Sequence, residues 1–165
     1  MARTERQCGL SKLEFLLVLA VIAVLLLVAL EQMKEVQELS EEMVVEATLR
    51  NISSGLRYAM AEDIIHGTEG RIAERVGGNP VRWLDQPPAG YLGEFPATPE
   101  PLPAGAWVFD STRRELCYRP KLFKHLVIAG DGQLLRWRIE SVAASPASAR
   151  VSAVRVAAVQ VYSWF

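Results

Sequence analysis

The stretch from Phe15 to Leu30, FLLVLAVIAVLLLVAL, contains sixteen consecutive residues without a polar side chain. As a helix it spans roughly 24 Å at about 1.5 Å per residue, and Leu10 and Leu13 extend its apolar surface toward the ~30 Å hydrocarbon core of a bilayer. A helix that is apolar all round has no face for water, and a chain of 165 residues is too small to bury it in a soluble core. The stretch therefore predicts a membrane span over residues 10–30.

The charges on the two sides of this span differ in sign. The basic residues Arg3, Arg6 and Lys12 precede it, whereas residues 31–46 carry six glutamates and one lysine. Positive flanks stay on the cytoplasmic side, so the N-terminus is expected in the cytoplasm and the rest of the chain across the membrane. A cleaved secretory signal peptide is the alternative, but its apolar region is shorter, about 7–15 residues, and Leu27-Val28-Ala29 is a poor cleavage site.

Glu14 lies directly before the apolar run, framed by Leu13 and Phe15. A carboxylate that is fully immersed in hydrocarbon costs about 2.5–3.5 kcal/mol when nothing pairs with it. A plain signal anchor has no need of such a charge. Either the side chain reaches the membrane interface or a cation neutralises it.

The residues around Glu14, GLSKLEF from Gly9 onward, together with the apolar run that follows, resemble the processing site of type IV pilins and of the pseudopilins of type II secretion. The resemblance implies a leader peptide over residues 1–9, cleavage between Gly9 and Leu10 by prepilin peptidase, and N-methylation of Leu10. It makes Glu14 the fifth residue of the mature chain, where the family carries glutamate.

The same resemblance implies an assembly role for Glu14. The amine freed on Leu10 has an ordinary pKa of ~8 and is largely cationic at neutral pH. Leu10 and Glu14 share a helix face, but in the family the glutamate meets the N-terminus of a neighbouring subunit, which turns a desolvation cost into a preference for filament entry. The implied partners are prepilin peptidase, other pilin or pseudopilin subunits, the inner-membrane assembly platform and membrane lipid.

The helical pattern continues past the membrane. Neither Pro nor Gly occurs between Leu10 and Ser54, and apolar residues recur every three or four positions: Val45, Leu49, Ile52, Leu56, Met60 and Ile64. The spacing predicts one helix over about residues 11–66, with an amphipathic second half over 31–66 that packs on the rest of the chain. Gly55 predicts a bend.

Composition changes after this helix. Residues 67–105 hold seven of the nine prolines, so they are expected to form an ordered loop without regular structure beyond a short helix near Arg71–Val76. Apolar side chains are expected to pin the loop to the sheet: Trp83, Leu84, Tyr91, Leu92 and Phe95.

Residues 106–165 predict an antiparallel sheet of about four strands. Two hairpins are expected, 106–110 with 115–119, and 126–129 with 133–140 across Gly130-Asp131-Gly132, and then a last strand over 151–162. The fold class is therefore α+β, a long helix packed on a sheet. The resemblance implies the pilin-like fold, with an MSHA-type minor pilin as the nearest kind.

The remaining composition argues against other classes. Eighteen basic and nineteen acidic residues give a net charge of −1, which disfavours nucleic-acid binding. His66, His125 and Cys117 have no catalytic motif around them, and no metal or cofactor site is expected. The expected function is structural: a minor pilin-like subunit that starts in the inner membrane with its C-terminal part in the periplasm and then enters a pilus. The alternatives are a type II secretion pseudopilin and an unprocessed, signal-anchored periplasmic binding module.

Overall fold

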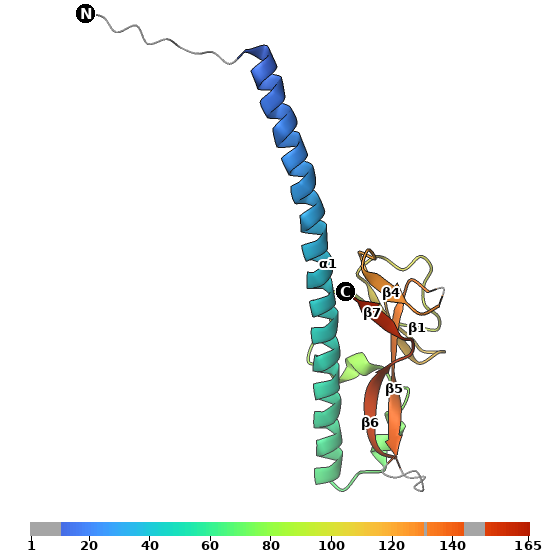
Figure 1. Cartoon of the computed structure of the whole chain (residues 1–165). Coiled ribbons are helices and arrows are strands. Elements are labelled where there is room, and N and C mark those ends of the chain that lie inside the picture. The colour runs from blue at the N-terminus through green and yellow to red at the C-terminus, as the bar shows by residue number, and fades with distance from the viewer. Residues whose placement is uncertain (1–10, 131, 144–150) are drawn as a thin grey trace, which may run out of the picture. The chain divides into compact units, whose positions relative to one another are not determined.

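The computed structural model describes residues 11–130, 132–143 and 151–165. The chain divides into two compact units, one that ends at Gln37, the apolar unit, and one that covers Glu38–Phe165, the globular unit. The helix α1 (Lys12–Ile65) contributes to both units (Figure 1). The predicted helix over residues 11–66 is confirmed.

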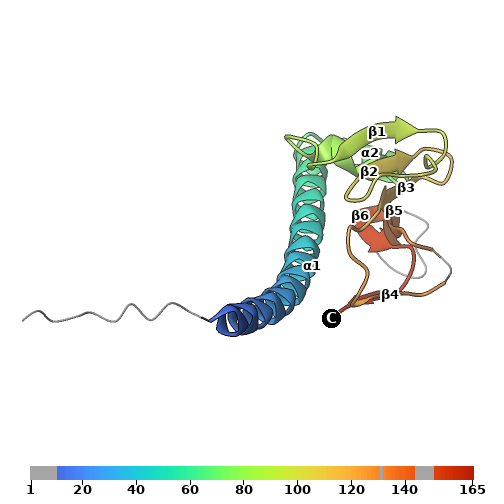
Figure 2. The same cartoon turned by 90° about the horizontal axis from the view of Figure 1, so that it is seen from above.

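After α1 the described residues form two short helices and seven strands. The short helices are α2 (Arg71–Glu74) and the 3-10 helix η1 (Pro80–Trp83). The strands are β1 (Tyr91–Phe95), β2 (Trp107–Asp110), β3 (Glu115–Tyr118), β4 (Leu126–Ile128), β5 (Leu135–Ala143), β6 (Val151–Ala158) and β7 (Tyr162–Trp164). Five of them form one sheet in the order β1-β2-β3-β5-β6 (Figure 2), while β4 pairs with β7 (Figure 1). The α+β class is confirmed.

The core of the globular unit lies between α1 and the five-stranded sheet. Val45 and Ile52 from α1 form one cluster with Trp107 of β2 and Trp137 of β5, which are at most 2% exposed. Leu56, one turn further along α1, packs with a second cluster that includes Ile139. The predicted apolar stripe is therefore the packing face of α1, but it ends before Ile64, which is 53% exposed.

The first predicted hairpin is confirmed and the second is wrong. β2 and β3 pair antiparallel with Trp107 opposite Tyr118 and Asp110 opposite Glu115. β4 pairs with β7 instead of with its sequence neighbour β5, which lies between β3 and β6. The turn residues around Gly130 predict only that the chain turns there. They do not say which strand each arm meets, and the buried Trp137 places β5 in the larger sheet.

The Pro-rich segment is more regular than expected. Asn79 caps η1 by accepting a hydrogen bond from the Val81 N–H at 3.0 Å, and Pro80 occupies the first turn, where a missing N–H costs nothing. β1 contains no proline and pairs parallel with β2 at the edge of the sheet. The sheet is thus mixed rather than purely antiparallel, and it has five strands instead of about four.

The predicted attachment of this segment holds for four of its five side chains. Leu84 and Tyr91 pack on the cluster that contains Trp107, Trp83 packs on the cluster that contains Leu56, and Phe95 packs beside Val108 and Cys117 on the other side of the sheet. Leu92 is 49% exposed and does not pin the loop.

Gly55 marks a close approach of two segments. A Cβ at this position would lie 2.1 Å from the carbonyl oxygen of Trp83, so α1 and η1 can meet only because the side chain is missing. Gly55→Ala is therefore expected to destabilise the protein by about 1–2 kcal/mol, because a clash with backbone puts the overpacking cost at about 2–3 kcal/mol, which exceeds the gain in helix propensity of about 1 kcal/mol.

Chemical unfolding of the full chain in detergent measures this effect. Gly70→Ala is the matched control, because nothing lies within 4 Å of a Cβ there. If Gly55→Ala were as stable as the parent chain or more stable, the close approach would not limit this position.

Candidate functional site

The residues that the sequence singled out for processing lie at the start of the chain. Gly9 and Leu10 fall outside the described residues, whereas Glu14 lies in the first turn of α1 and is exposed. The structure therefore describes the surroundings of Glu14 alone among the three.

Glu14 forms a reciprocal pair of hydrogen bonds with Ser11. The Ser11 N–H donates to Glu14 Oε2 at 3.1 Å, and the Glu14 N–H donates to Ser11 Oγ at 3.3 Å. The Phe15 N–H donates to the Ser11 carbonyl at 3.0 Å, so Ser11 is the N-cap of α1. This arrangement is a capping box, which satisfies donors that the first helical turn otherwise leaves unpaired.

The capping box gives Ser11 a role that the sequence interpretation missed. Its signal is the spacing Ser11-Lys12-Leu13-Glu14, a serine followed three residues later by a glutamate at the start of an apolar helix. The same carboxylate thus completes the helix end of its own chain and, being exposed, presents its charge to the outside.

The apolar unit exposes a continuous hydrophobic surface. Each described residue of this unit, 11–37, is exposed. Leu17, Ile22 and Leu27 are between 47% and 68% exposed, which a helix in water does not tolerate over this length. Among the described residues, α1 is the one helix that is long and apolar enough to cross a membrane.

Glu38 is the first residue of the globular unit and is almost completely buried, at 1% exposure. Its Oε1 accepts hydrogen bonds from the His125 backbone N–H at 2.9 Å and from Trp164 Nε1 at 3.2 Å. Its Oε2 lies 3.1 Å from His125 Nδ1, and the His125 ring stacks on Phe165. One carboxylate therefore ties α1 to the segment before β4 and to β7.

Glu41 repeats this attachment one turn further along α1. Its Oε1 accepts hydrogen bonds from the Tyr118 hydroxyl at 2.6 Å and from the Lys121 backbone N–H at 2.7 Å. Burial raises the pKa of Tyr118, so its hydroxyl keeps the proton that it donates. Glu38 and Glu41 together fasten α1 to the end of β3 and to the β4–β7 sheet.

The sequence interpretation treated these two glutamates as charges that flank the membrane. A usable signal existed, because Glu38, Val45 and Ile52 are spaced by seven residues and so lie on the same helix face. A glutamate in register with an apolar stripe points to a buried, hydrogen-bonded carboxylate. His125, which has no catalytic motif around it in the sequence, is the partner of this carboxylate, with its Nδ1 3.1 Å from Glu38 Oε2.

Cys117 is buried in β3. Burial raises the pKa of its thiol, and Thr98 Oγ1 lies 3.6 Å from its sulfur. The thiol is therefore packed and protonated at neutral pH. Among the described residues no group of three or more His, Cys, Asp or Glu side chains is arranged to hold a metal ion.

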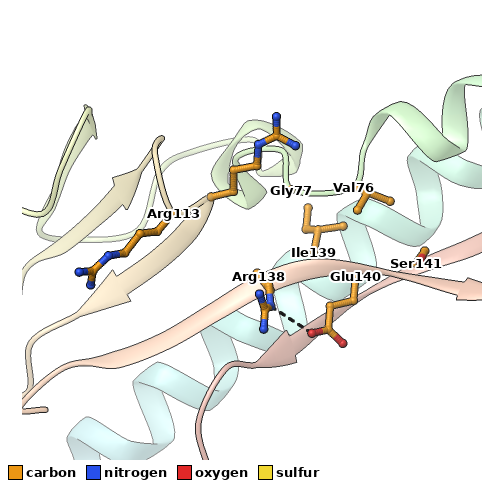
Figure 3. A pocket seen from close by; sticks show the side chains of 8 residues that line it. Val76, Gly77, Arg113, Arg138, Ile139, Glu140 and Ser141 are labelled. Carbon is orange, nitrogen blue, oxygen red and sulfur yellow. Dashed lines mark hydrogen bonds and ion pairs between the residues drawn. The ribbon is translucent and has the colours of Figure 1, made fainter. Parts of the chain in front are cut away.

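A shallow pocket of about 420 Å³ opens on the globular unit, where β5 extends beyond the end of β3 (Figure 3). Arginines from two parts of the chain line it, Arg113 and Arg114 from the β2–β3 turn and Arg138 from β5.

Three buried carboxylates have pKa values below their ordinary ones. For Glu38 and Asp110, burial raises the pKa, but hydrogen bonds from His125 and Trp164 and from Arg113 and Thr98, respectively, outweigh it. For Asp63, the hydrogen bond from Arg75 lowers the pKa and outweighs burial. Each group favours the folded state while it is ionised.

Acid is therefore expected to destabilise the globular unit. A carboxylate whose pKa is lowered on folding contributes its full stability above its unfolded pKa, and this contribution is lost as the pH falls through the folded value. The melting temperature of the full chain should be nearly constant above about pH 5 and should fall below about pH 4. Circular dichroism at a series of pH values measures it.

Asp63→Asn supplies the internal control for this pH dependence. The variant should be less stable than the parent chain at pH 7, because Arg75 loses its anionic partner, and should lose less on acidification. A melting temperature that stays constant from neutral pH down to about pH 3 would contradict the assignment of these carboxylates as ionised.

Comparison with protein-family models, with curated proteins and with solved structures finds no match to this chain.

Proposed function

We propose that the chain is the precursor of a minor pilin-like subunit, cut by prepilin peptidase between Gly9 and Leu10 and then built into a type IV pilus of the MSHA kind, where it assists assembly or tip formation. The observation that carries the proposal is the position of Glu14. It stands four residues after the proposed new N-terminus, at the first turn of a 54-residue helix whose apolar surface is exposed.

The exposed apolar unit supports two successive environments for the same helix. In a bilayer, lipid covers the side chains of residues 13–30, and in a filament the corresponding helices of other subunits cover them. The helix of a signal-anchored module is covered by lipid in the same way, so the feature that favours the subunit is the charge of Glu14 at the start of the apolar run, for which a plain anchor has no need.

Glu14 supplies the selective step in this proposal. Its carboxylate is held at the helix end by Ser11 and stays exposed, so it can face the methylated amine of Leu10 on a neighbouring subunit. Pairing the two charges removes the cost of keeping either one alone next to hydrocarbon. The buried Glu38 and the partly buried Glu41 fix their part of α1 to the β4–β7 sheet and to the end of β3.

Coexpression with a prepilin peptidase tests the processing step. The parent chain should lose its nine N-terminal residues. Gly9→Val should block the cut, because a branched side chain replaces the hydrogen of the residue on the leader side of the bond. Ala2→Val, within the leader but away from the bond, is the matched control and should be cut normally. Cleavage of Gly9→Val at the parent rate, or an uncut parent chain, would refute the proposed function.

A further inference from the structure

The arginine-lined pocket shown in Figure 3 is built from three segments of the globular unit. β3 pairs with β5 only as far as Leu116 opposite Trp137, whereas β5 continues to Ala143. Beyond Trp137, β5 has no partner on the side of β3. The space there is closed by Arg113 and Arg114 of the β2–β3 turn, residues 111–114, and by Val76-Gly77. The Gly77 N–H donates to the Ile139 carbonyl at 3.0 Å and fixes one wall to the strand.

The charges of the pocket do not cancel. Its one carboxylate, Glu140, accepts a hydrogen bond from Arg138 Nε at 3.1 Å and lies 3.9 Å from Arg155 Nη2, so two arginines already share it. Figure 3 shows Arg138 turned toward Glu140 and the Arg113 guanidinium turned away from both. Within the described part of the chain, the guanidinium groups of Arg113 and Arg114 have no hydrogen bond or ion pair.

The nearest carboxylates on β2 and β3 offset this surplus only in part, because Asp110 attracts the charge of Arg113 without a direct contact between the two side chains. Asp110 is 2% exposed and takes hydrogen bonds from Thr98 and from the Arg113 backbone N–H, not from its guanidinium. Glu115 is 7% exposed, and no ion pair joins it to an arginine among the described residues. The guanidinium groups of the turn therefore face solvent with their donors available.

The backbone around Arg114 holds its side chain at the pocket. Arg114 has a φ of 57°, a backbone conformation that few residues other than glycine adopt without cost. Its chain lies against Gly77, where an added Cβ would stand 2.7 Å from Arg114 Cδ. The missing side chain at Gly77 thus leaves room for Arg114, whose Nη1 would also lie 3.4 Å from that Cβ, and the whole side chain lines the pocket.

We infer that this pocket binds carboxylates of an acidic peptide segment on a neighbouring subunit, an inference that rests on the proposed function. Arginine forks match carboxylates with two parallel hydrogen bonds, and a shallow, open pocket suits side chains of a protein surface better than a small ligand that needs enclosure. Glu140 inside the pocket disfavours the higher charge of a phosphate. The chain itself carries an acidic segment, because residues 31–46 contain six glutamates and one lysine. Glu38 and Glu41 are already bound within the globular unit, whereas Glu35 and Glu46 are exposed.

Fluorescence anisotropy with the full chain in uncharged detergent tests the inference. The probe is a labelled peptide with the sequence of residues 31–46, and the control probe has its glutamates replaced by glutamine. The double variant Arg113→Gln, Arg114→Gln should bind the acidic peptide about 5- to 25-fold more weakly. The double variant Arg50→Gln, Arg57→Gln removes the same net charge from exposed α1 positions and should bind within about twofold of the parent chain.

Near-UV circular dichroism checks that the pocket variant is folded. If the double variant does not fold, Arg113→Gln alone replaces it in the assay, because the Arg113 guanidinium makes no hydrogen bond or ion pair among the described residues. Three results would overturn the inference. The pocket variant could bind the acidic peptide as tightly as the parent chain, the pocket and control variants could lose the same affinity, or the parent chain could bind the two peptides equally. Displacement of the peptide by inorganic phosphate at lower concentration than by free glutamate would also overturn it, in favour of a phosphate group. The binding assay does not depend on cleavage at Gly9. The inference can therefore fail while the proposed function stands, and cleavage can fail while the pocket still binds the peptide.

Discussion

Glu14→Ala is expected to lower incorporation into filaments by about tenfold or more while cleavage after Gly9 and methylation of Leu10 continue. The variant leaves the Leu10 amine of the neighbouring subunit without a counter-ion beside hydrocarbon, and an unpaired charge there costs about 2.5–3.5 kcal/mol when fully immersed. The amount of the protein in sheared filaments, relative to the amount in membranes, measures incorporation.

Two further variants separate the charge of Glu14 from its capping role. Glu14→Gln keeps a side chain that completes a capping box but removes the charge, so it should fail to incorporate nearly as Glu14→Ala does. Ser11→Ala removes the hydroxyl of the N-cap at a cost of about 1 kcal/mol and keeps the carboxylate, so it should incorporate almost normally. Normal incorporation of Glu14→Gln would show that capping, and not charge neutralisation, is what the filament requires.

Glu38→Ala is expected to destabilise the globular unit by about 3–5 kcal/mol, the largest effect of any substitution on stability considered for this chain. The variant leaves the His125 N–H, His125 Nδ1 and the buried Trp164 Nε1 without their acceptor and opens a cavity where the buried Glu38 side chain was, although His125 itself is partly exposed. Chemical unfolding of the full chain in detergent, followed by tryptophan fluorescence, measures the change because Trp164 and Trp107 share the core that unfolds.

Glu35→Ala is the matched control for this substitution. Glu35 lies one turn before Glu38 on α1 and is exposed, so its loss should change the free energy of unfolding by about 0.5 kcal/mol or less. Similar stabilities for Glu38→Ala and Glu35→Ala would mean that the Glu38 carboxylate does not hold α1 to the β4–β7 sheet.

Local patterns in the sequence predicted the elements that depend on local physics. The absence of Pro and Gly together with the apolar spacing predicted α1 almost to the residue, and the polar turn between Asp110 and Glu115 predicted the β2–β3 hairpin. The partner of β4 was not predictable in this way, because β7 lies more than thirty residues later in the chain and nothing near Leu126 favours it over β5. β1 was not predicted because prolines lie on both sides of it, which made the whole segment look irregular although the five residues of β1 contain no proline.

In the candidate site, too, the features that depend on neighbouring residues were predictable and those that depend on distant residues were not. The position of Glu14 beside the apolar run was visible in the sequence, and its capping partner Ser11 was visible in the spacing but was not used. Glu38 shares a helix face with Val45, yet its burial depends on His125 and Trp164, which are 87 and 126 residues away along the chain. The arginine pocket likewise forms only when the β2–β3 turn, Gly77 and β5 meet.

The N-terminal residue of the mature protein tests the account most directly. Mass spectrometry of the N-terminal peptide from the protein in filaments should find a chain that begins at Leu10 and carries one added methyl group on its amine. A filament protein that still begins at Met1, or one that begins close to Ala29, would leave no amine in register with Glu14 and would contradict the proposed assembly step.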